Sequence, residues 1–232
     1  MPLRLRPTAP IAQAAILVGD PGRALLLAQS LLEQPKMSNH ARGLWGYSGD
    51  TAAGRPLSIQ STGMGGPSAA IVLQELSELG VRRAVRVGTC GALRADLGHG
   101  VLVVAGDAIA EDGASRALGA GEIAEPDAGL TRRLAAALPG APEPGRVVTT
   151  DLFYDGDSRP EPPEAWLERG AVAVEMEAAT LFILGERIGV ATACLLAVSD
   201  TFEDVQRRRI DDEALADAVA RMGSAAAAAL GG

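Results

Sequence analysis

Short apolar runs alternate with amphipathic stretches along most of this chain. The runs are bounded by glycine, proline or polar residues, as buried strands are, whereas the stretches repeat apolar residues at helical spacing. We therefore predict strands over Ala14–Val18, Leu57–Thr62, Ala84–Val87, Val101–Ala105, Arg146–Thr149, Ala171–Val174 and Ala191–Val198, and helices over Ala24–Glu33, Ser68–Leu79, Ala128–Leu138, Ala178–Ile188 and Asp212–Leu230. This order predicts an α/β fold, a three-layer sandwich in which helices flank a central mixed β-sheet.

Two polar segments interrupt the alternation. Asp112–Asp127 is rich in glycine and alanine, and Asp155–Glu164 combines prolines with acidic residues. Because proline resists both helix and strand, we interpret both segments as surface loops, and the second as a candidate lid over a site.

The composition restricts both the fold and the partners. The chain has 232 residues, and its apolar content of 47% is enough for the core of a single domain that covers residues 1–232. It contains 21 Lys and Arg residues and 29 Asp and Glu residues, which gives a formal net charge of −8. This charge disfavours nucleic acid as a partner, because phosphate backbones are bound by clustered cations.

We also expect a cytoplasmic protein without a membrane partner. No apolar run reaches the roughly 18 residues that span a bilayer. Met1–Arg6 leads into a strand-like segment rather than into the apolar core of a signal peptide. Cys90 and Cys194 have no cluster of cysteine and histidine near them, so we interpret both as buried thiols and expect neither a disulfide framework nor a metal site.

Three turns that follow predicted strands carry features suited to an anion. In Gly19–Arg23 a glycine turn leads into a helix start, where free N–H groups and the helix dipole favour phosphate, and in Ser61–Ser68 glycines permit a close approach of the backbone. The alternative for both is an ordinary tight turn. In Arg86–Ala92 an arginine lies inside an apolar strand, which is costly unless an anion or a carboxylate meets it. Ligands of open α/β sheets bind beyond the carboxyl ends of strands, so the three turns together favour free phosphate.

Acidic residues follow two other predicted strands. Glu175 and Glu177 lie at a strand-to-helix junction in apolar surroundings, where a charge needs partners such as ribose hydroxyls. The alternative for either is a carboxylate that stabilises the helix dipole. Asp200 ends a strongly apolar strand, where loss of solvent favours a protonated carboxyl that acts as general acid for a leaving base. Its alternative role is a helix cap.

Five ordered motifs carry a family resemblance. They are Gly-Asp-Pro-x-Arg at 19–23, Gly-Met-Gly-x-Pro-Ser at 63–68, Arg-Val-Gly-Thr-Cys-Gly at 86–91, Glu-Met-Glu-Ala-Ala at 175–179 and Ser-Asp at 199–200. In this order and spacing they resemble the nucleoside phosphorylase family of hexameric purine nucleoside phosphorylases and uridine phosphorylases. The resemblance implies a phosphorylase-like fold and phosphorolysis of nucleosides to free base and ribose 1-phosphate. It also implies a homohexamer built as a trimer of dimers, and no cofactor, with inorganic phosphate as co-substrate.

The resemblance also implies roles for individual residues. The phosphate-binding residues are Gly19, Arg23, Arg86 and Thr89, with Arg42 reaching in from a neighbouring subunit. The ribose-binding residues are Met64, Met176 and Glu177, and the residues around the base are Cys90, Gly91, Phe153, Asp157 and Arg159. The catalytic acid is Asp200, and its helper is Arg207, with Arg208 and Arg209 as further candidates and solvation as the alternative for each.

The chain departs from the family pattern in two places. Purine enzymes of the family carry a histidine near the N-terminus that contacts the ribose 5′ hydroxyl, where this chain has Leu3 or Arg4. The segment Phe153–Arg159 resembles the uracil-reading segment of uridine enzymes, except that Asp157 replaces an amide and cannot donate to a uracil carbonyl. On the strength of Asp200 we favour purine nucleosides, with uridine phosphorylase as the alternative. A nucleosidase that uses water and a non-catalytic nucleoside-binding protein are the remaining hypotheses.

Overall fold

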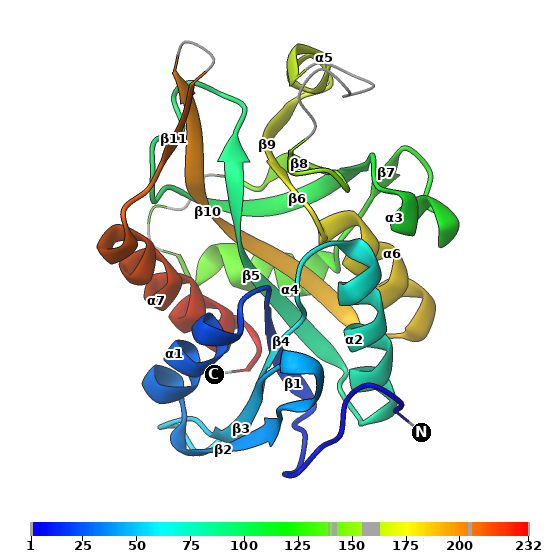
Figure 1. Ribbon diagram of the computed structural model, residues 1–232, viewed down its shortest axis with the longest axis vertical. Coiled ribbons are helices and arrows are strands. Elements are labelled where there is room, and N and C mark those ends of the chain that lie inside the picture. The colour runs from blue at the N-terminus through cyan, green and yellow to red at the C-terminus, as the bar shows by residue number, and fades with distance from the viewer. Residues whose placement is uncertain (1, 139, 141–142, 155–162, 204–205, 232) are drawn as a thin grey trace.

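A mixed β-sheet with helices on both faces forms the framework of the protein (Figure 1). The computed structural model describes residues 2–138, 140, 143–154, 163–203 and 206–231. The strands are β1 (Ala14–Val18), β2 (Glu33–Asn39), β3 (Gly46–Asp50), β4 (Pro56–Ser61), β5 (Arg83–Ala92), β6 (Leu102–Ala110), β7 (Ile123–Ala124), β8 (Gly145–Thr149), β9 (Ala171–Glu175), β10 (Ala191–Glu203) and β11 (Gln206–Arg209). The helices are α1 (Pro21–Leu31), the short 3-10 helix η1 (Ala41–Gly43), α2 (Gly66–Glu78), α3 (Gly113–Ala117), α4 (Ala128–Ala136), α5 (Pro163–Glu168), α6 (Ala178–Ile188) and α7 (Asp212–Ala229).

The sheet runs in the order β11-β10-β6-β8-β9-β5-β1-β4-β3-β2, and β7 pairs with β6. Strand β5 pairs with β10 as well as with β9, so β5, β10, β6, β8 and β9 close into a ring. This closure bends the middle of the sheet into a small barrel, whose interior is filled by side chains. The remaining strands extend from β5 as an open, twisted sheet.

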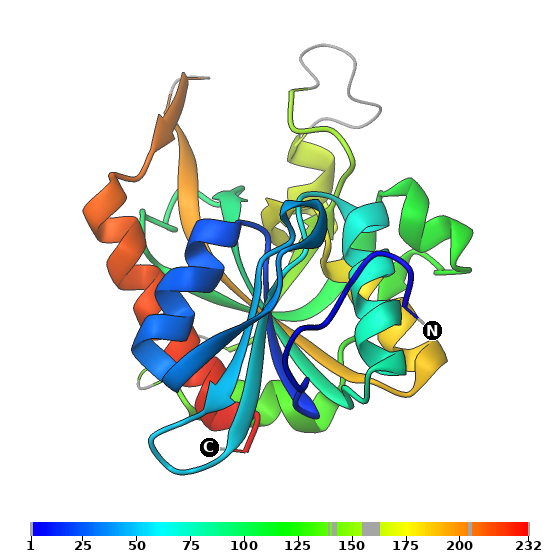
Figure 2. The ribbon, with the colours of Figure 1, turned by 60° about the horizontal axis from the view of Figure 1, so that its bottom comes forward.

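Alternation along β1 divides the core between the two helical layers. Ile16 and Val18 pack in the cluster that holds the buried faces of α1, α4 and α7. Ala15 and Leu17 point the other way, into the cluster formed with α2 and α6. Successive side chains of a strand face opposite sides of a sheet, so one short apolar run joins both layers. Figure 2 shows α1 and α7 together on one side of the sheet and α2 and α6 on the other.

The predicted fold class is confirmed, and each predicted strand and helix has a counterpart in the structure. β1 and α6 have the predicted bounds. The largest differences are at the ends of β5, β6 and β10, which continue to Ala92, Ala110 and Glu203. The apolar pattern of β5 and β10 stops earlier because their ends carry polar residues that belong to the candidate site. Among the described residues, no helix is both long and apolar enough to cross a membrane.

Several elements differ from the prediction. The interpretation of Asp112–Asp127 as a loop is wrong in part, because this segment contains α3 and β7. The predicted helix Ala24–Glu33 ends at Leu31, and β2 and β3 follow it as a polar hairpin without an apolar pattern to mark it. Helix α5 occupies the end of the predicted Asp155–Glu164 loop, and residues 155–162 lie outside the described residues.

Glu75 of α2 anchors the N-terminal segment, residues 3–5. Its carboxylate accepts hydrogen bonds from the backbone N–H groups of Leu3 (2.9 Å), Arg4 (2.9 Å) and Leu5 (2.6 Å). Burial by itself would raise the Glu75 pKa, but these three donors outweigh it and lower the pKa. The segment is therefore held to α2 by an ionised carboxylate.

Candidate active site

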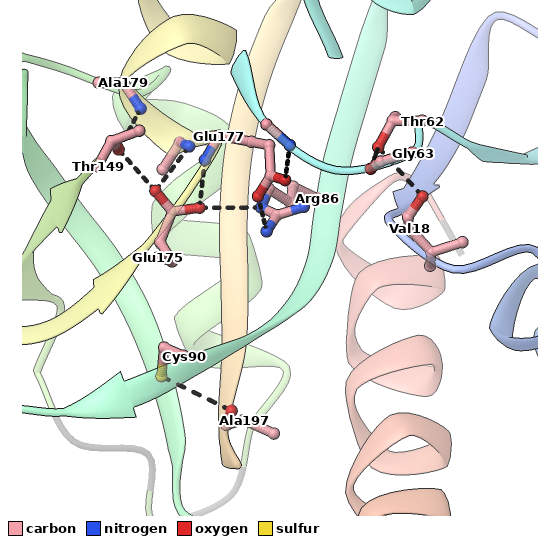
Figure 3. A network of polar contacts seen from close by, with 12 residues as sticks. Val18, Thr62, Gly63, Arg86, Cys90, Thr149, Glu175, Glu177, Ala179 and Ala197 are labelled. Atoms are coloured by element: carbon pink, nitrogen blue, oxygen red, sulfur yellow. Dashed lines mark hydrogen bonds and ion pairs between the residues drawn. The ribbon is translucent and has the colours of Figure 1, made fainter. Parts of the chain in front are cut away.

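The loops after β1 and β4 meet at one edge of the sheet, because both strands run parallel in register. The backbone N–H of Thr62 donates to the Val18 carbonyl oxygen at 2.7 Å, and the Thr62 hydroxyl lies 3.2 Å from the same oxygen (Figure 3). Gly63 and Gly65 have φ angles of 73° and 86°, a left-handed conformation that favours glycine. The two predicted turns therefore form one glycine-lined edge beside β5.

Arg86 lies between two glutamates in the middle of this edge (Figure 3). Its Nε donates to Glu175 Oε2 at 3.2 Å, and its Nη2 forms an ion pair with Glu177 Oε2. Burial alone would lower the Arg86 pKa, but the charges of Glu177 and Glu175 outweigh it and raise the pKa. The prediction that a buried Arg86 needs an anion or a carboxylate is confirmed, and carboxylates meet it.

The two glutamates have different surroundings. Glu175 accepts from the backbone N–H groups of Glu177 and Ala178, each at 2.9 Å, and from the Thr149 hydroxyl at 2.6 Å. Glu175 is thus the carboxylate that accepts the free backbone N–H groups at the start of α6. Glu177 instead accepts from the backbone N–H of Gly65 at 2.6 Å, across the edge of the sheet. A carboxylate has about four lone-pair sites, so Glu177 keeps acceptor capacity for a ligand.

Burial raises the pKa of Glu175, which the charge of Arg86 opposes. The side chain of Glu175 is fully buried, and that of Glu177 is 4% exposed. Two carboxylates and one guanidinium thus share a site without solvent. The site therefore offers carboxylate oxygens and a guanidinium group close together. These groups suit a ligand that carries both hydroxyl groups and negative charge.

Arg23 in the first turn of α1 faces the same cluster. Burial is the main reason that its pKa is lowered; the charge of Asp20 opposes this, while the positive charges of Arg86 and Arg209 add to it. Its guanidinium makes no hydrogen bond to the part of the chain that the structure describes. Its backbone N–H is taken by the Asp20 side chain at 2.8 Å, so this turn has fewer free N–H groups than predicted. An anion would relieve the mutual repulsion of these arginines.

Asp200 lies in β10 and binds Arg207. Arg207 Nε donates to Asp200 Oδ1 at 2.8 Å, and the Arg207 guanidinium lies 3.9 Å from the ring centre of Phe153. The Ser199 hydroxyl lies 2.6 Å from the other carboxylate oxygen of Asp200. Asp200 is 7% exposed, and the helix that follows is capped by Asp211, so the alternative role of Asp200 as a helix cap is wrong. Arg207 remains exposed to solvent while it binds Asp200.

The comparison with known families agrees with this geometry. The model of the Phosphorylase superfamily matches residues 13–231. The chain belongs to the phosphorylase superfamily. The family resemblance predicted from the five motifs is thereby confirmed.

Individual relatives of this superfamily cover most of the chain. It is 38% identical over 197 residues to a purine nucleoside phosphorylase DeoD-type of Caldanaerobacter subterraneus subsp. tengcongensis, which covers 82% of this chain and 84% of the relative. It is 37% identical over 198 residues to the protein of that name from Alkaliphilus metalliredigens, with 82% and 83% covered. For the protein of that name from Clostridium beijerinckii the identity is 34% over 202 residues, with 84% of both chains covered.

The structure brings several other predicted residues to the same edge. Thr89, Cys90 and Gly91 all lie in β5, and Gly91 is paired with Asp200 of β10. Thr89 is half-buried, whereas Cys90 is buried and its Sγ lies 3.6 Å from the Ala197 carbonyl oxygen. Met176 is half-buried between the two glutamates.

Four predicted residues are not placed against this cluster. Met64 is 82% exposed. Arg42 lies in η1 with φ 60°, is exposed, and forms no hydrogen bond or ion pair with another predicted site residue among those described. Asp157 and Arg159 lie outside the described residues.

Three residues of this superfamily member were missed by sequence reasoning. The Thr149 hydroxyl donates to Glu175 and accepts a hydrogen bond from the backbone N–H of Ala179 at 2.9 Å. Ser199 contacts Asp200, and Asp112 is buried near Gly66. Thr149 ends a predicted strand and Ser199 precedes a predicted acid, so position gave a weak signal for both. Asp112 had none, because its segment was interpreted as a surface loop.

Two cavities lie elsewhere in the described molecule. One of about 520 Å³ is lined by Glu111, Arg116 and Arg169 among others, and one of about 660 Å³ lies between α6 and residues 123–128. Neither is lined by the arginines and glutamates of the candidate site. Convergent charge, rather than cavity volume, identifies the site in this chain.

Proposed function

We propose that this protein is a purine nucleoside phosphorylase, which transfers the pentose of a purine nucleoside from the base to inorganic phosphate. The observation that carries the proposal is the edge of the sheet where Arg23, Arg86 and Glu177 lie beside the Asp200–Arg207 pair. The relatives that bear the name purine nucleoside phosphorylase cover 82% of the chain and support the choice of base.

Phosphate would bind to the arginine side of this edge. Gly19, Arg23, Arg86 and Thr89 would supply its donors, and Arg42 of a second copy would complete the set. Arginine forks suit the phosphate oxygens, and a dianion offsets the repulsion between the guanidinium groups. At Arg23 the charges of Asp20 and Glu177 oppose the positive charges of Arg86 and Arg209.

Ribose would bind to Glu177, with Met64 and Met176 beside the ring. The free lone pairs of Glu177 would accept the 2′ and 3′ hydroxyls, while its bond to Gly65 holds the carboxylate still. As the bond between C1′ and the base nitrogen breaks, its electron pair leaves with the base and C1′ becomes cationic. A phosphate oxygen on the opposite face then forms the new bond, and its negative charge stabilises the cation.

The base would lie beside Asp200, against Cys90, Gly91 and Phe153. Asp200 would give its proton to N7 of the purine as the glycosidic bond breaks. Arg207 donates to Asp200 Oδ1 at 2.8 Å, so it would hold the carboxyl in place and bind the oxygen that is left when the proton passes to the base. Positioning and charge account for the reaction, so we propose that it needs no cofactor. We further propose a homohexamer that works in the cytoplasm.

Release of bases tests this function directly. The protein is incubated with inosine, adenosine, guanosine or uridine, each with and without phosphate, and the bases are separated by chromatography. We expect purine bases and ribose 1-phosphate, formed only when phosphate is present. Uridine as the sole substrate would make the chain a uridine phosphorylase, release without phosphate a nucleosidase, and tight binding without turnover a non-catalytic protein.

Asp200→Asn tests the acid. The amide keeps the shape of the side chain but cannot supply the carboxyl proton, so kcat for inosine should fall by about 10² to 10⁴. Asp211→Asn is the matched control, since Asp211 only caps α7, with 2.8 Å to the Ala214 N–H. An Asp200→Asn enzyme as active as this control would refute the assignment.

A further inference from the structure

Asp112 is a buried carboxylate that the reaction described above does not use. It is 0% exposed and precedes α3, where its Oδ2 accepts from the Ser115 backbone N–H at 2.8 Å. The Ser115 hydroxyl lies 2.5 Å from Oδ1, and the Thr180 hydroxyl lies 2.5 Å from Oδ2. In the described part of the chain its partners are neutral donors, without lysine or arginine. Burying a carboxylate is costly unless hydrogen bonds meet it, and here three donors do so.

The carboxylate lies where the first turns of three helices meet. It caps α3, and Thr180 belongs to the first turn of α6. A Cβ atom on Gly66, the first residue of α2, would lie 2.9 Å from Asp112 Oδ2 and 2.5 Å from Thr180 Oγ1. The start of α2 therefore packs directly on the Asp112–Thr180 hydrogen bond, and the positive ends of three helix dipoles surround the charge.

This junction supports both ends of the hydrogen bond that orients Glu177. The donor of that bond is the backbone N–H of Gly65, the neighbour of Gly66. The acceptor, Glu177, precedes α6 and lies one helical turn before Thr180. A shift of the start of α2 relative to α6 would pull Gly65 away from Glu177. Asp112 lies against the start of both helices, because it accepts from Thr180 of α6 and packs against Gly66 of α2.

We infer that Asp112, acting through Thr180, is a positioning residue for the sugar of the substrate. It holds the Gly65–Glu177 hydrogen bond in place, so that Glu177 presents its remaining lone pairs to the ribose hydroxyls. This inference rests on the proposed function, which assigns the ribose to Glu177. It separates recognition of the sugar from recognition of the base, which lies beside Asp200 and Phe153.

The test removes one hydroxyl and leaves the shape of the side chain. Thr180→Val deletes the donor to Asp112, and Thr180→Ser keeps it. Thr131→Val is the matched control, because Thr131 is also a buried threonine in a helix, and its hydroxyl has no hydrogen-bond partner among the described residues. If Thr180→Val does not fold, Asp112→Asn replaces it in the test. Its matched control is Asp127→Asn, because Asp127 caps α4 in the same way that Asp112 caps α3.

Affinities for inosine and for the free base hypoxanthine are measured by calorimetry with each purified full-length protein. Thr180→Val should weaken inosine binding up to about tenfold, because Glu177 is then less firmly positioned toward the ribose hydroxyls. Hypoxanthine binding should stay unchanged, as should the KM for phosphate. Thr180→Ser should bind inosine like the wild type, and Thr131→Val should do the same.

Three results would overturn the inference. They are unchanged inosine affinity in Thr180→Val and Asp112→Asn, equal loss of inosine and hypoxanthine affinity, or equal loss in the matched controls. The wild-type protein tests the proposed function separately. If it binds inosine but does not turn it over, the proposed reaction fails, while the ratio of variant to wild-type affinities still decides the role of Asp112.

Discussion

Replacing Arg86 by methionine should destabilise the protein strongly. The side chains of Arg86, Glu175 and Glu177 are 6%, 0% and 4% exposed, so solvent screens their attraction very little. Methionine keeps most of the length of the side chain but leaves two buried carboxylates without their cation. Removing one partner of such a buried pair costs about 3–5 kcal/mol.

Uptake of a proton by Glu175 would limit this destabilisation. Burial already raises the pKa of Glu175, and loss of the opposing Arg86 charge would raise it further. Glu175 would then fold as the neutral acid rather than as an unpaired anion, which keeps the loss within the range above. The variant should also show a stability that falls more steeply as pH rises, because its folded state binds the additional proton.

Urea unfolding, followed by circular dichroism at one fixed protein concentration, measures the loss. For a chain of this size about 1 kcal/mol shifts the melting temperature by roughly 2–4 °C, so thermal melts should move by about 6–20 °C. Arg94→Met is the control, since the Arg94–Asp96 pair is exposed, and it should unfold like the wild type. A loss below about 1 kcal/mol in Arg86→Met would refute the reasoning that the buried pair is tightly coupled.

Three further predictions concern other groups. Burial raises the pKa of the Cys90 and Cys194 thiols, so neither should react with a disulfide reagent at pH 8 until the protein is unfolded. The Glu75 pKa is lowered, so Glu75 stabilises the N-terminal segment fully above its unfolded pKa of about 4.3, and this stabilisation is lost as pH falls through the lower folded pKa. Hydrogen exchange of the three anchored amides should therefore accelerate over that pH interval. An exchange rate that shows only its intrinsic pH dependence would contradict this. Arg209→Gln should raise the KM for phosphate, because the charge of Arg209 acts on Arg23. Arg208 lies on the opposite face of β11, so Arg208→Gln should leave the KM unchanged. Equal changes of KM in both variants would show that Arg209 does not face the anion.

The sequence by itself determined the fold class and the edge of the sheet at which the site lies. Apolar runs with strand-like bounds predicted β1, β4, β5, β6, β8, β9 and β10, because strands buried on both faces need apolar residues locally. Polar residues just past those runs, such as Thr89, Glu177 and Asp200, then marked the carboxyl ends of strands. These inferences need only local patterns, and the structure bears out the placement.

Contacts between distant segments decided the rest. Only the tertiary structure assigned Glu175 to the start of α6 and Glu177 to Gly65, although the two glutamates read alike in the sequence. It also placed Arg207 on Asp200 and packed Asp112 against Gly66. The physical reason is that a polar side chain has no periodic pattern of its own: its role is set by the partners that folding brings to it, and these partners lie far along the chain.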